Sequence, residues 1–447
     1  MKPLSLVGHV IELYELVRSA TVPTDAVVND FVRERRYLGS KDRRFLTDAL
    51  YGIVRHRKRL EATLEHSLKQ MNLWAPAPHV PALWMYVAYK VCIRDRSPKA
   101  LLGEISSLWI TSSPDVDLER LSVLLQENAQ LRFLPEFPAL RLSTEYSYPT
   151  WMVEQWLRRL GEDETRRLCA AMNEVAPVVI RVNTMMASPE ECRAALEKEG
   201  IPCHPTSLSP FGLILEKRTN VHGLNAFRGG LFEIQDEGSQ LLSLLVDPRR
   251  GQFIVDACAG GGGKALHLSV LMENGGQIIA LDVDGHRLER LRKRCRRANA
   301  VNVEPVLVDK GDDSAEGSYV AMADAVLVDA PCSGSGTIRR NPGTKWSLTQ
   351  QAIAEYQYRQ QSVLTRYSRL VKPGGRIVYA TCSLLEEENE EVVQSFLSKQ
   401  PSFRVQPARE VLEKWNLQHL AEREFLSLLP HRHGTDGFFA AVLARNP

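Results

Sequence analysis

Two cysteines and an aspartate each follow a short apolar run that predicts a buried strand. Residues 325–328 read Ala-Val-Leu-Val and lead into Asp329, with Cys332 shortly after it. Residues 376–380 read Arg-Ile-Val-Tyr-Ala and are followed, after one threonine, by Cys382. Neighbouring strands lie roughly 4.8 Å apart, and open α/β sheets bind ligands at the carboxyl ends of their strands. We therefore expect the acid and both thiols to face one pocket at that edge.

A thiol in such a pocket can serve as a nucleophile. Covalent catalysis divides one difficult step into easier ones, and the thiolate is the reactive form of cysteine. Ser383 and Glu386 have the S-x-x-E spacing of a capping box, which predicts that a helix begins beside Cys382 and favours its thiolate. Either cysteine alone could be a small buried hydrophobe, which is the commoner fate of a free thiol. The pair at two strand ends favours chemistry.

The composition sets limits on the class of protein. The 447 residues predict two or three domains, and 44% hydrophobic with 25% charged residues is ordinary for a globular protein with a core. The net charge is only +2, so binding of nucleic acid would rest on local clusters. Eight cysteines without a CxxC pair predict neither a disulfide framework nor a metal site. With no signal-peptide core and no run of 18 apolar residues, we expect a cytoplasmic protein without a membrane partner.

From about residue 231 to the end, strand and helix patterns alternate. Apolar runs predict strands at 253–256, 277–282, 306–309, 325–328, 376–380 and 438–443. A helical pattern before the fifth of these runs stops at Lys372-Pro373-Gly374-Gly375. This alternation is typical of α/β proteins with a doubly wound, mostly parallel sheet of the Rossmann-like type.

The first 230 residues contain two regions with other sequence patterns. Residues 1–140 show apolar positions at helical spacing and no strand bounded by glycines, which predicts an all-helical domain. Residues 145–230 contain a strand pattern at 178–183, a helix start at Ser188-Pro189 and a strand pattern at 213–215. This predicts a small α+β module that either presents RNA or links the two larger parts.

A glycine-rich loop follows the first strand of the C-terminal series. Residues 258–264 read Cys-Ala-Gly-Gly-Gly-Gly-Lys, and such a loop lets backbone approach a ligand at the positive end of the next helix. It lacks the Ser or Thr of a phosphate-binding loop, because Ala265 stands there, and it does not match GxGxxG cleanly. Asp282, Asp309 and Asp329 end successive strands. Any one of them alone would more simply cap a helix or be solvated, but the series suits a positively charged nucleoside such as S-adenosylmethionine.

These residues resemble the motifs of the RNA cytosine-5 methyltransferases, the Sun/RsmB/NOP2 family. The resemblance covers roughly 145–447 and includes the glycine loop, Asp282 with Arg287, and the cysteine motifs at 329–334 and 381–383. Further matches are Arg339-Arg340-Asn341-Pro342 with Lys345-Trp346, Glu388-Asn389-Glu390 and Asp436-Gly437-Phe438-Phe439. The family usually has Ala-Pro where this chain has Gly260-Gly261, and Thr in place of Ala265. We therefore expect a more flexible loop, which costs more entropy to order around a cofactor.

The resemblance implies an S-adenosylmethionine site and a mechanism. Cofactor contacts are expected from Cys258, Ala259, Gly260, Gly261, Gly262, Gly263, Lys264, Asp282, Arg287, Asp309 and Asp329. The family pattern assigns the attack on carbon 6 of cytosine to Cys382, a proton for ring nitrogen 3 to Asp329, and assistance in enzyme release to Cys332. A stacked base hides its face, so flipped or single-stranded RNA is expected as the substrate.

The helical N-terminus carries a second resemblance. Asp42-Arg43-Arg44 and the stretch Tyr-Gly-Ile-Val-Arg at 51–55 are similar to the helical RNA-binding domain related to the antitermination factor NusB. This similarity implies the RsmB branch, which methylates small-subunit ribosomal RNA. We accordingly expect a NusB-like domain at 1–140, the small module at 145–230, a methyltransferase domain at 231–447, a ribosomal RNA partner and a monomeric protein.

Local basic clusters supply the candidate RNA contacts. Arg43 and Arg44 are candidates on the helical domain, and Arg339, Arg340 and Lys345 are candidates just after the active loop. The basic stretch 55–59 ends a predicted helix, where cations complement the helix dipole, and could equally bind phosphate. The arginine-rich helix at 287–297 is more simply a solvated outer face.

Other functions stay open at this point. The changed glycine loop is compatible with a non-catalytic ribosome-assembly or RNA-binding factor, although the intact Asp329, Cys332 and Cys382 favour an enzyme. The same residues would also suit a cytosine-5 methyltransferase that acts on transfer RNA, or a methyltransferase whose substrate is a protein.

Overall fold

The computed structural model describes the chain except for a few short stretches. The described residues are 2–73, 80–217, 219–309, 311, 314–421 and 424–447. They divide into two compact units. One comprises the chain up to Glu174 together with Ile338–Leu348, and the other comprises Val175–Thr337 and Thr349–Pro447.

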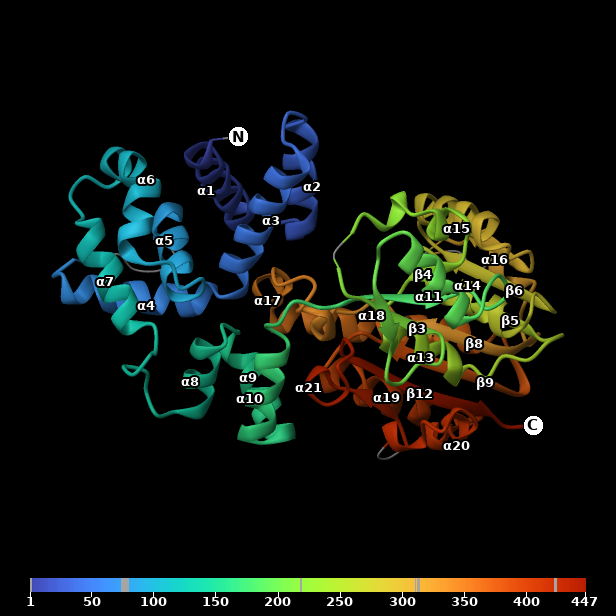
Figure 1. Cartoon of the computed structure of the whole chain (residues 1–447). Coiled ribbons are helices and arrows are strands. Elements are labelled where there is room, and N and C mark those ends of the chain that lie inside the picture. Colours follow the sequence, from blue (N-terminus) through green and yellow to red (C-terminus); the bar gives the residue numbers. More distant parts are fainter. Residues whose placement is uncertain (1, 74–79, 218, 310, 312–313, 422–423) are drawn as a thin grey trace. The chain divides into compact units, whose positions relative to one another are not determined.

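The N-terminal unit is helical (Figure 1). Its helices are α1 (Pro3–Ser19), α2 (Thr24–Glu34), α3 (Ser40–Arg55), α4 (Arg57–Gln70), α5 (Ala82–Cys92), α6 (Pro98–Ser112), α7 (Leu118–Asn128), α8 (Pro138–Glu145), α9 (Thr150–Leu160), α10 (Glu162–Ala171) and α17 (Thr344–Ser347). Among the residues described before Val178 no strand occurs, which confirms the predicted helical N-terminal region.

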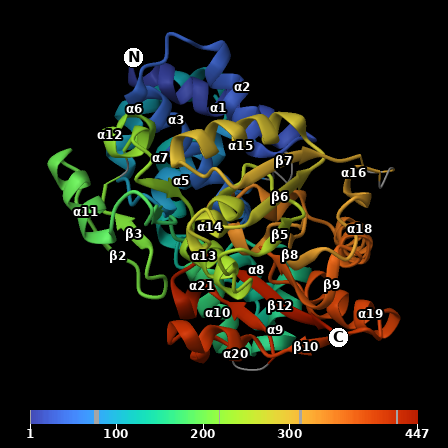
Figure 2. The same ribbon diagram turned by 90° about the vertical axis from the view of Figure 1, so that its right-hand side faces the viewer.

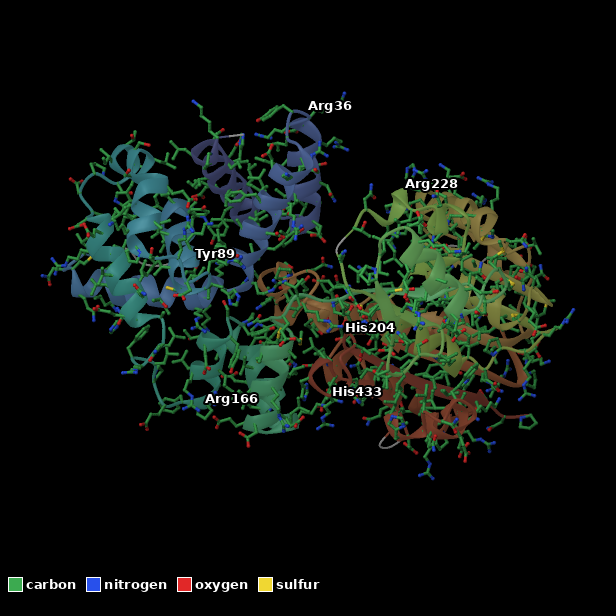
Figure 3. The ribbon with its side chains drawn as sticks, viewed as in Figure 1. Arg36, Tyr89, Arg166, His204, Arg228 and His433 are labelled. Carbon is green, nitrogen blue, oxygen red and sulfur yellow. The ribbon has the colours of Figure 1, made fainter. Side chains whose placement is uncertain are left out.

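The apolar spacing read from the sequence defines the core of this unit. Leu46, Leu50 and Ile53 of α3 are fully buried, as expected for positions three or four residues apart on one helix face. Gly52 of the same helix admits the ring of Tyr89, labelled in Figure 3, because a β-carbon there would approach that ring to 2.3 Å. The glycine of the NusB-like stretch therefore serves close helix packing.

The second unit begins with a small antiparallel sheet. Its strands are β1 (Val178–Val182), β2 (Cys203–Pro205), β3 (Gly212–Leu215) and β4 (Phe232–Ile234), in the order β2-β3-β1-β4. The elements beside it are α11 (Pro189–Lys198), η1 (Val221–Gly223) and α12 (Asn225–Arg228). Helix α11 starts at the predicted place, where Ser188 and Glu191 form a capping box and Pro189 occupies the first turn.

A larger sheet follows, in the order β10-β12-β9-β8-β5-β6-β7, with β11 paired to β12. Its strands are β5 (Phe253–Asp256), β6 (Gln277–Asp282), β7 (Val303–Leu307), β8 (Ala323–Asp329), β9 (Val371–Thr381), β10 (Phe403–Gln406), β11 (Leu426–Leu428) and β12 (Phe438–Arg445). The strands from β5 to β9 pair in parallel, whereas β12 runs antiparallel to β9 and β10. The predicted doubly wound, mostly parallel fold is confirmed.

Helices cover both faces of this sheet (Figure 2). They are α13 (Glu237–Leu245), α14 (Gly263–Leu271), α15 (Gly285–Ala298), α16 (Ser314–Gly317), α18 (Gln350–Ser368), α19 (Glu390–Lys399), α20 (Ala408–Leu412) and α21 (Pro430–His433), with short turns η2 (Ser335–Thr337), η3 (Glu386–Glu388), η4 (Glu413–Trp415) and η5 (Gln418–Leu420).

Strand residues alternate between the two faces. Ile254 of β5 packs in the core with α13 and α14, and its neighbour Val255 packs in the opposite core with α18 and α19. A strand that is buried on both sides reads as a continuous apolar run, which is why these strands were recognisable from sequence. Within the described residues, no helix combines the length and the apolar character needed to cross a bilayer.

Candidate active site

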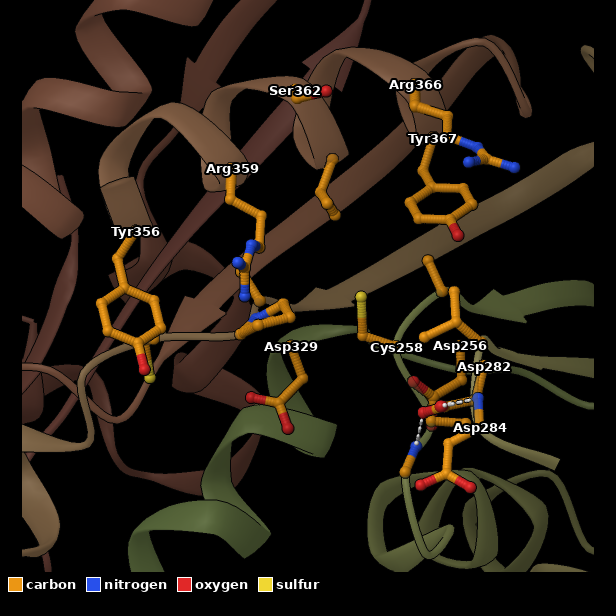
Figure 4. Close-up of a pocket in the computed structure, with 18 of the residues that line it drawn as sticks. Asp256, Cys258, Asp282, Asp284, Asp329, Tyr356, Arg359, Ser362, Arg366 and Tyr367 are labelled. Carbon is orange, nitrogen blue, oxygen red and sulfur yellow. Dashed lines mark hydrogen bonds between the residues drawn. The ribbon is translucent and has the colours of Figure 1, made fainter. Parts of the chain in front are cut away.

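The acids and thiols meet at the carboxyl ends of the parallel strands. A cavity of about 2110 Å³ opens there in the second unit (Figure 4). Its lining includes Asp256, Asp282, Asp329, Cys332 and Cys382. Strands β8 and β9 are parallel neighbours with Asp329 opposite Ala380, so the expected adjacency of the two strands is confirmed.

The two thiols are in direct contact. The Sγ atoms of Cys332 and Cys382 are 3.2 Å apart. The hydrogen bond with Cys382, followed by burial, raises the pKa of Cys332 well above its ordinary value. The neutral thiol form of Cys332 is therefore favoured, and either sulfur can be the donor in the contact.

The predicted capping box beside Cys382 is wrong. Residues 386–388 form the 3₁₀ turn η3, and the next α-helix, α19, begins only at Glu390. The Ser383 hydroxyl donates to Glu388 Oε2 at 2.5 Å, and Glu386 lies in η3 and not in the first turn of an α-helix as a capping box requires. The helix terminus that was expected to favour the Cys382 thiolate is thus absent at this position.

Glu388 instead holds the two cysteine loops together. Its fully buried carboxylate accepts hydrogen bonds from the Ser333 amide at 2.8 Å, from the Ser333 and Ser383 hydroxyls at 2.5 Å each, and from Gln360 Nε2 at 2.9 Å. These serines directly follow the two cysteines. Sequence reasoning noted Glu388 only as part of a motif, because nothing local reveals that its partners lie in another loop.

Asp329 is paired with a lysine of the glycine loop. Lys264 Nζ lies 2.5 Å from Asp329 Oδ2. Burial alone would lower the pKa of Lys264, but the attraction of Asp329 outweighs it and the pKa is raised. The pair thus holds one transferable proton beside the two thiols.

The glycine loop adopts a defined backbone path between β5 and α14. Asp282 accepts from the Gly260 amide at 2.7 Å and from the Asp284 amide at 2.8 Å, so this carboxylate shapes the loop as well as lining the cavity. Gly262 has a φ of +80°, and a β-carbon there would lie 2.0 Å from Leu291, so only glycine fits. Gly262 packs on α15 and is not among the described cavity residues, unlike its neighbours.

The other predicted cofactor residues fall into two groups. Cys258, Ala259 and Arg287 line the cavity, as do Gly260, Gly261, Gly263 and Lys264. Burial, then the charge of Asp329, raises the pKa of Cys258 well above its ordinary value, so this thiol stays neutral. Asp309 is exposed and accepts from the Gly311 amide at 3.2 Å, and it is not among the described residues that line the cavity. The structure therefore does not place Asp309 with the other predicted cofactor residues in the cavity lining, because strand β7 ends two residues before it, at Leu307.

Asp256 is a cavity residue that the sequence analysis did not single out. It ends β5, is 1% exposed, and neither carboxylate oxygen makes a hydrogen bond of normal geometry within the described structure. Burial, then the charge of Asp329, raises its pKa to about 7. A buried acid without a good partner fits a cationic ligand, and its place at a strand end was the available signal.

Two of the predicted RNA contacts are buried inside the helical unit. Lys345 is fully buried, and its ammonium donates to the carbonyls of Arg55 at 3.0 Å and Ser147 at 2.9 Å and to Asn173 Oδ1 at 2.8 Å. Arg339 is 6% exposed. Both side chains are therefore buried in this structure, and their contact with RNA stays a prediction.

The other predicted RNA contacts remain accessible. Arg340 is half-buried, whereas Arg43 and Arg44 are exposed on α3. Arg43 Nε donates to the Leu38 carbonyl at 2.9 Å, and Arg44 lies 3.5 Å from Asp48. An exposed ion pair of this kind contributes little, so it leaves the arginine able to exchange partners.

Comparison with known proteins agrees with the site. The model of the family "16S rRNA methyltransferase RsmB/F" matches residues 243–444, and that of the RsmF/B-like ferredoxin-like domain matches 148–222. The "Probable ribosomal RNA small subunit methyltransferase B" of Bacillus subtilis is 33% identical over 312 residues, which cover 69% of each protein. The protein of the same name from Synechocystis is 29% identical over 94% of this chain and 95% of its own. A crystal structure of a methyltransferase homologue from Pyrococcus horikoshii is 29% identical with a TM-score of 0.59, and covers 70% of this chain and all of that one.

The doubly wound sheet, the glycine loop and the strand-end acids define an S-adenosylmethionine-dependent methyltransferase. The chain belongs to the RsmB/F family of ribosomal RNA methyltransferases, in agreement with the resemblance of its sequence motifs. The cavity suits this cofactor, because the Asp256 carboxylate lacks a good partner and lies where a cationic ligand would enter.

Proposed function

We propose that this protein methylates carbon 5 of a cytosine in RNA, and that the RNA is small-subunit ribosomal RNA. The observation that carries the proposal is the contact between the Cys332 and Cys382 sulfurs beside the Lys264–Asp329 pair. Carbon 5 of cytosine is a weak nucleophile, and a site with two thiols and a proton source is suited to activate it. The RNA class follows from the family and from the names of the relatives.

Cys382 is assigned the first bond. Its thiolate adds to carbon 6, and the electron pair displaced from the ring is neutralised by a proton at nitrogen 3. Asp329 delivers that proton, which is replaced from Lys264 through their 2.5 Å hydrogen bond. The base is then an enamine with electron density at carbon 5. Bound S-adenosylmethionine supplies an electrophilic methyl group for that carbon.

Release reverses the first bond. The carbon 5 proton must leave before the Cys382 sulfur can depart from carbon 6, and the proton on nitrogen 3 returns to the Asp329–Lys264 pair. Cys332 lies 3.2 Å from the departing sulfur and is assigned to this stage, in which its thiol passes its proton to solvent and the thiolate so formed takes up the carbon 5 proton. Glu388 keeps the two loops in register throughout.

The helical unit is assigned to bind the RNA, and the cavity is assigned to receive the flipped base.

The test is methylation of purified small-subunit ribosomal RNA by the purified protein, followed by bisulfite sequencing of every cytosine. A single protected cytosine that also appears in cellular RNA, and that is lost when the gene is deleted, supports the proposal. Methylation of transfer RNA alone, or methyl transfer to an atom other than carbon 5, contradicts it.

A further inference from the structure

The four-glycine cofactor loop is fixed from three sides by side chains outside it. Asp282 accepts from the Gly260 amide at 2.7 Å. Arg294 Nη1 donates to the Gly261 carbonyl at 2.5 Å, and Arg181 Nη1 donates to the Gly263 carbonyl at 2.7 Å. Arg294 belongs to α15 and Arg181 to β1 of the small antiparallel sheet.

A buried acid of β4, Glu233, pairs with Arg294 and stands opposite Arg181 in the small sheet. Glu233 is 3% exposed and its Oε2 accepts from Arg294 Nε at 3.1 Å and Nη2 at 2.9 Å, while its Oε1 accepts from Arg297. Arg181 stands directly opposite Glu233 in the pairing of β1 with β4 and is 1% exposed. A buried acid lowers the cost of burying the guanidinium groups beside it, and the two hydrogen bonds that Arg294 donates to one oxygen of Glu233 fix the plane of its guanidinium group.

We propose that Arg294, held by Glu233, is a positioning residue for S-adenosylmethionine, so that the small sheet forms part of the cofactor site. Ordering a backbone residue costs conformational entropy, and glycine loses the most freedom. A loop of four consecutive glycines would meet that cost at each binding event. The hydrogen bonds from Arg294 and Arg181 order the loop beforehand, which leaves more of the interaction energy for affinity.

This role distinguishes Arg294 from the rest of its helix. Arg292 and Arg296 of α15 are exposed, as expected for a solvated face, whereas Arg294 is partly buried and points its guanidinium at the loop carbonyl. The inference depends on the cofactor that the family uses and not on which base of which RNA is methylated. It can therefore be tested without RNA.

The experiment compares Arg294→Ala with Arg296→Ala in the full-length protein. Titration calorimetry measures the Kd of S-adenosylmethionine, and hydrogen exchange of the peptide 257–264 measures loop order in the ligand-free protein. Arg296→Ala removes the same charge from the same helix and serves as the matched control. Losing one charge-assisted hydrogen bond should weaken binding by about tenfold or more and speed exchange in the free loop, with the control unchanged. Arg294→Lys keeps the charge but not the paired hydrogen bonds to Glu233, so its Kd should lie between those of the wild type and Arg294→Ala.

Steady-state kinetics distinguish a positioning role of Arg294 from a merely structural one. With RNA present, Arg294→Ala should raise the KM for S-adenosylmethionine while the KM for RNA stays unchanged. Wild-type affinity in Arg294→Ala would overturn the inference, as would weakened affinity with unchanged exchange in the free loop. If Arg294→Ala does not fold, the Arg294→Lys protein is measured instead. An unchanged Kd and unchanged hydrogen exchange in that variant would likewise overturn the inference.

Discussion

The two cysteines of the cavity are chemically unequal although their sulfurs touch. The contact with Cys382, followed by burial, raises the pKa of Cys332 and so favours the neutral thiol form of that residue. This asymmetry supports the assignment of the nucleophile to Cys382 on grounds other than the capping box, which the structure does not contain.

The two thiols should consequently fail in different ways when removed. In Cys382→Ala no adduct with RNA forms and methylation is lost. In Cys332→Ala the attack still occurs but release is impaired, so a methylated protein–RNA adduct should accumulate and survive a denaturing gel. The measurement uses labelled RNA with and without S-adenosylmethionine, and Cys258→Ser controls for loss of a neutral cavity thiol. Adduct in Cys382→Ala and none in Cys332→Ala would exchange the two roles.

Asp256 should make cofactor affinity depend on pH. Burial raises its pKa to about 7, and a cationic ligand favours the ionised form, so affinity for S-adenosylmethionine should rise as the pH passes from 6 to 8. Asp256→Asn should bind more weakly at pH 8 and lose that pH dependence, as followed by calorimetry. An unaltered pH profile in the variant would assign the dependence to another group.

The raised pKa of Asp256 also determines the direction in which stability changes with pH. Its pKa is higher in the folded protein than the ordinary value near 4, so the folded state binds the proton more tightly. Its contribution to the free energy of unfolding is fully present below about pH 4 and is lost as the pH rises through about 7. The ligand-free Asp256→Asn protein should therefore lose less stability than the wild type between pH 5 and 8 in urea titrations.

At the scale of elements, sequence reasoning succeeded where the local pattern and the final environment agree. The strands β5, β6 and β8 are apolar runs buried on both faces, and each was predicted to within two residues. Strand β9 ends one residue beyond its predicted run but begins at Val371, because it also contains Lys372-Pro373-Gly374-Gly375, which the sequence analysis interpreted as the stop of the preceding helix. Sequence reasoning did not reveal the burial of Lys345, whose charge and position after the active loop led to the prediction of an RNA contact. Its three acceptors come from the end of α3, from Ser147 and from Asn173, which no local pattern brings together.

Lys345 should accordingly affect stability. Burial lowers its pKa well below the ordinary value, and its ammonium also lies 3.8 Å from the centre of the Tyr148 ring. Lys345→Met keeps the volume but leaves three buried acceptors without their donor, at a cost of about 1–3 kcal/mol for each acceptor that stays unsatisfied. Urea unfolding of Lys345→Met beside the exposed Lys41→Met measures this. Equal stability of the two variants would mean that the buried contacts are dispensable.

At the scale of the whole molecule, the chain builds its two units in an interleaved order. It passes between them at 174–175, at 337–338 and at 348–349, so the helical unit contains eleven residues from the middle of the methyltransferase sequence. The domains predicted from sequence were consecutive segments of the chain, and such segments could not describe this insertion. The N-terminal helices and the catalytic sheet were predicted, because each has its own hydrophobic period, whereas the inserted segment has none that marks it as helical core.

Charge at this scale is distributed as patches, since the net charge is only +2. If the exposed Arg43 and Arg44 of α3 bind RNA phosphates, each contributes about one unit to the slope of log affinity against log salt. Charge reversal of both, Arg43→Glu with Arg44→Glu, should weaken binding of ribosomal RNA fragments and flatten that slope by about two. Arg158→Glu, an exposed position on α9, changes charge in the same unit and serves as the control. Filter binding from 50 to 300 mM salt measures the slopes. An unaltered slope in the double variant would show that α3 is not the phosphate-binding face, and an equal loss in Arg158→Glu would assign the effect to overall charge and not to this patch.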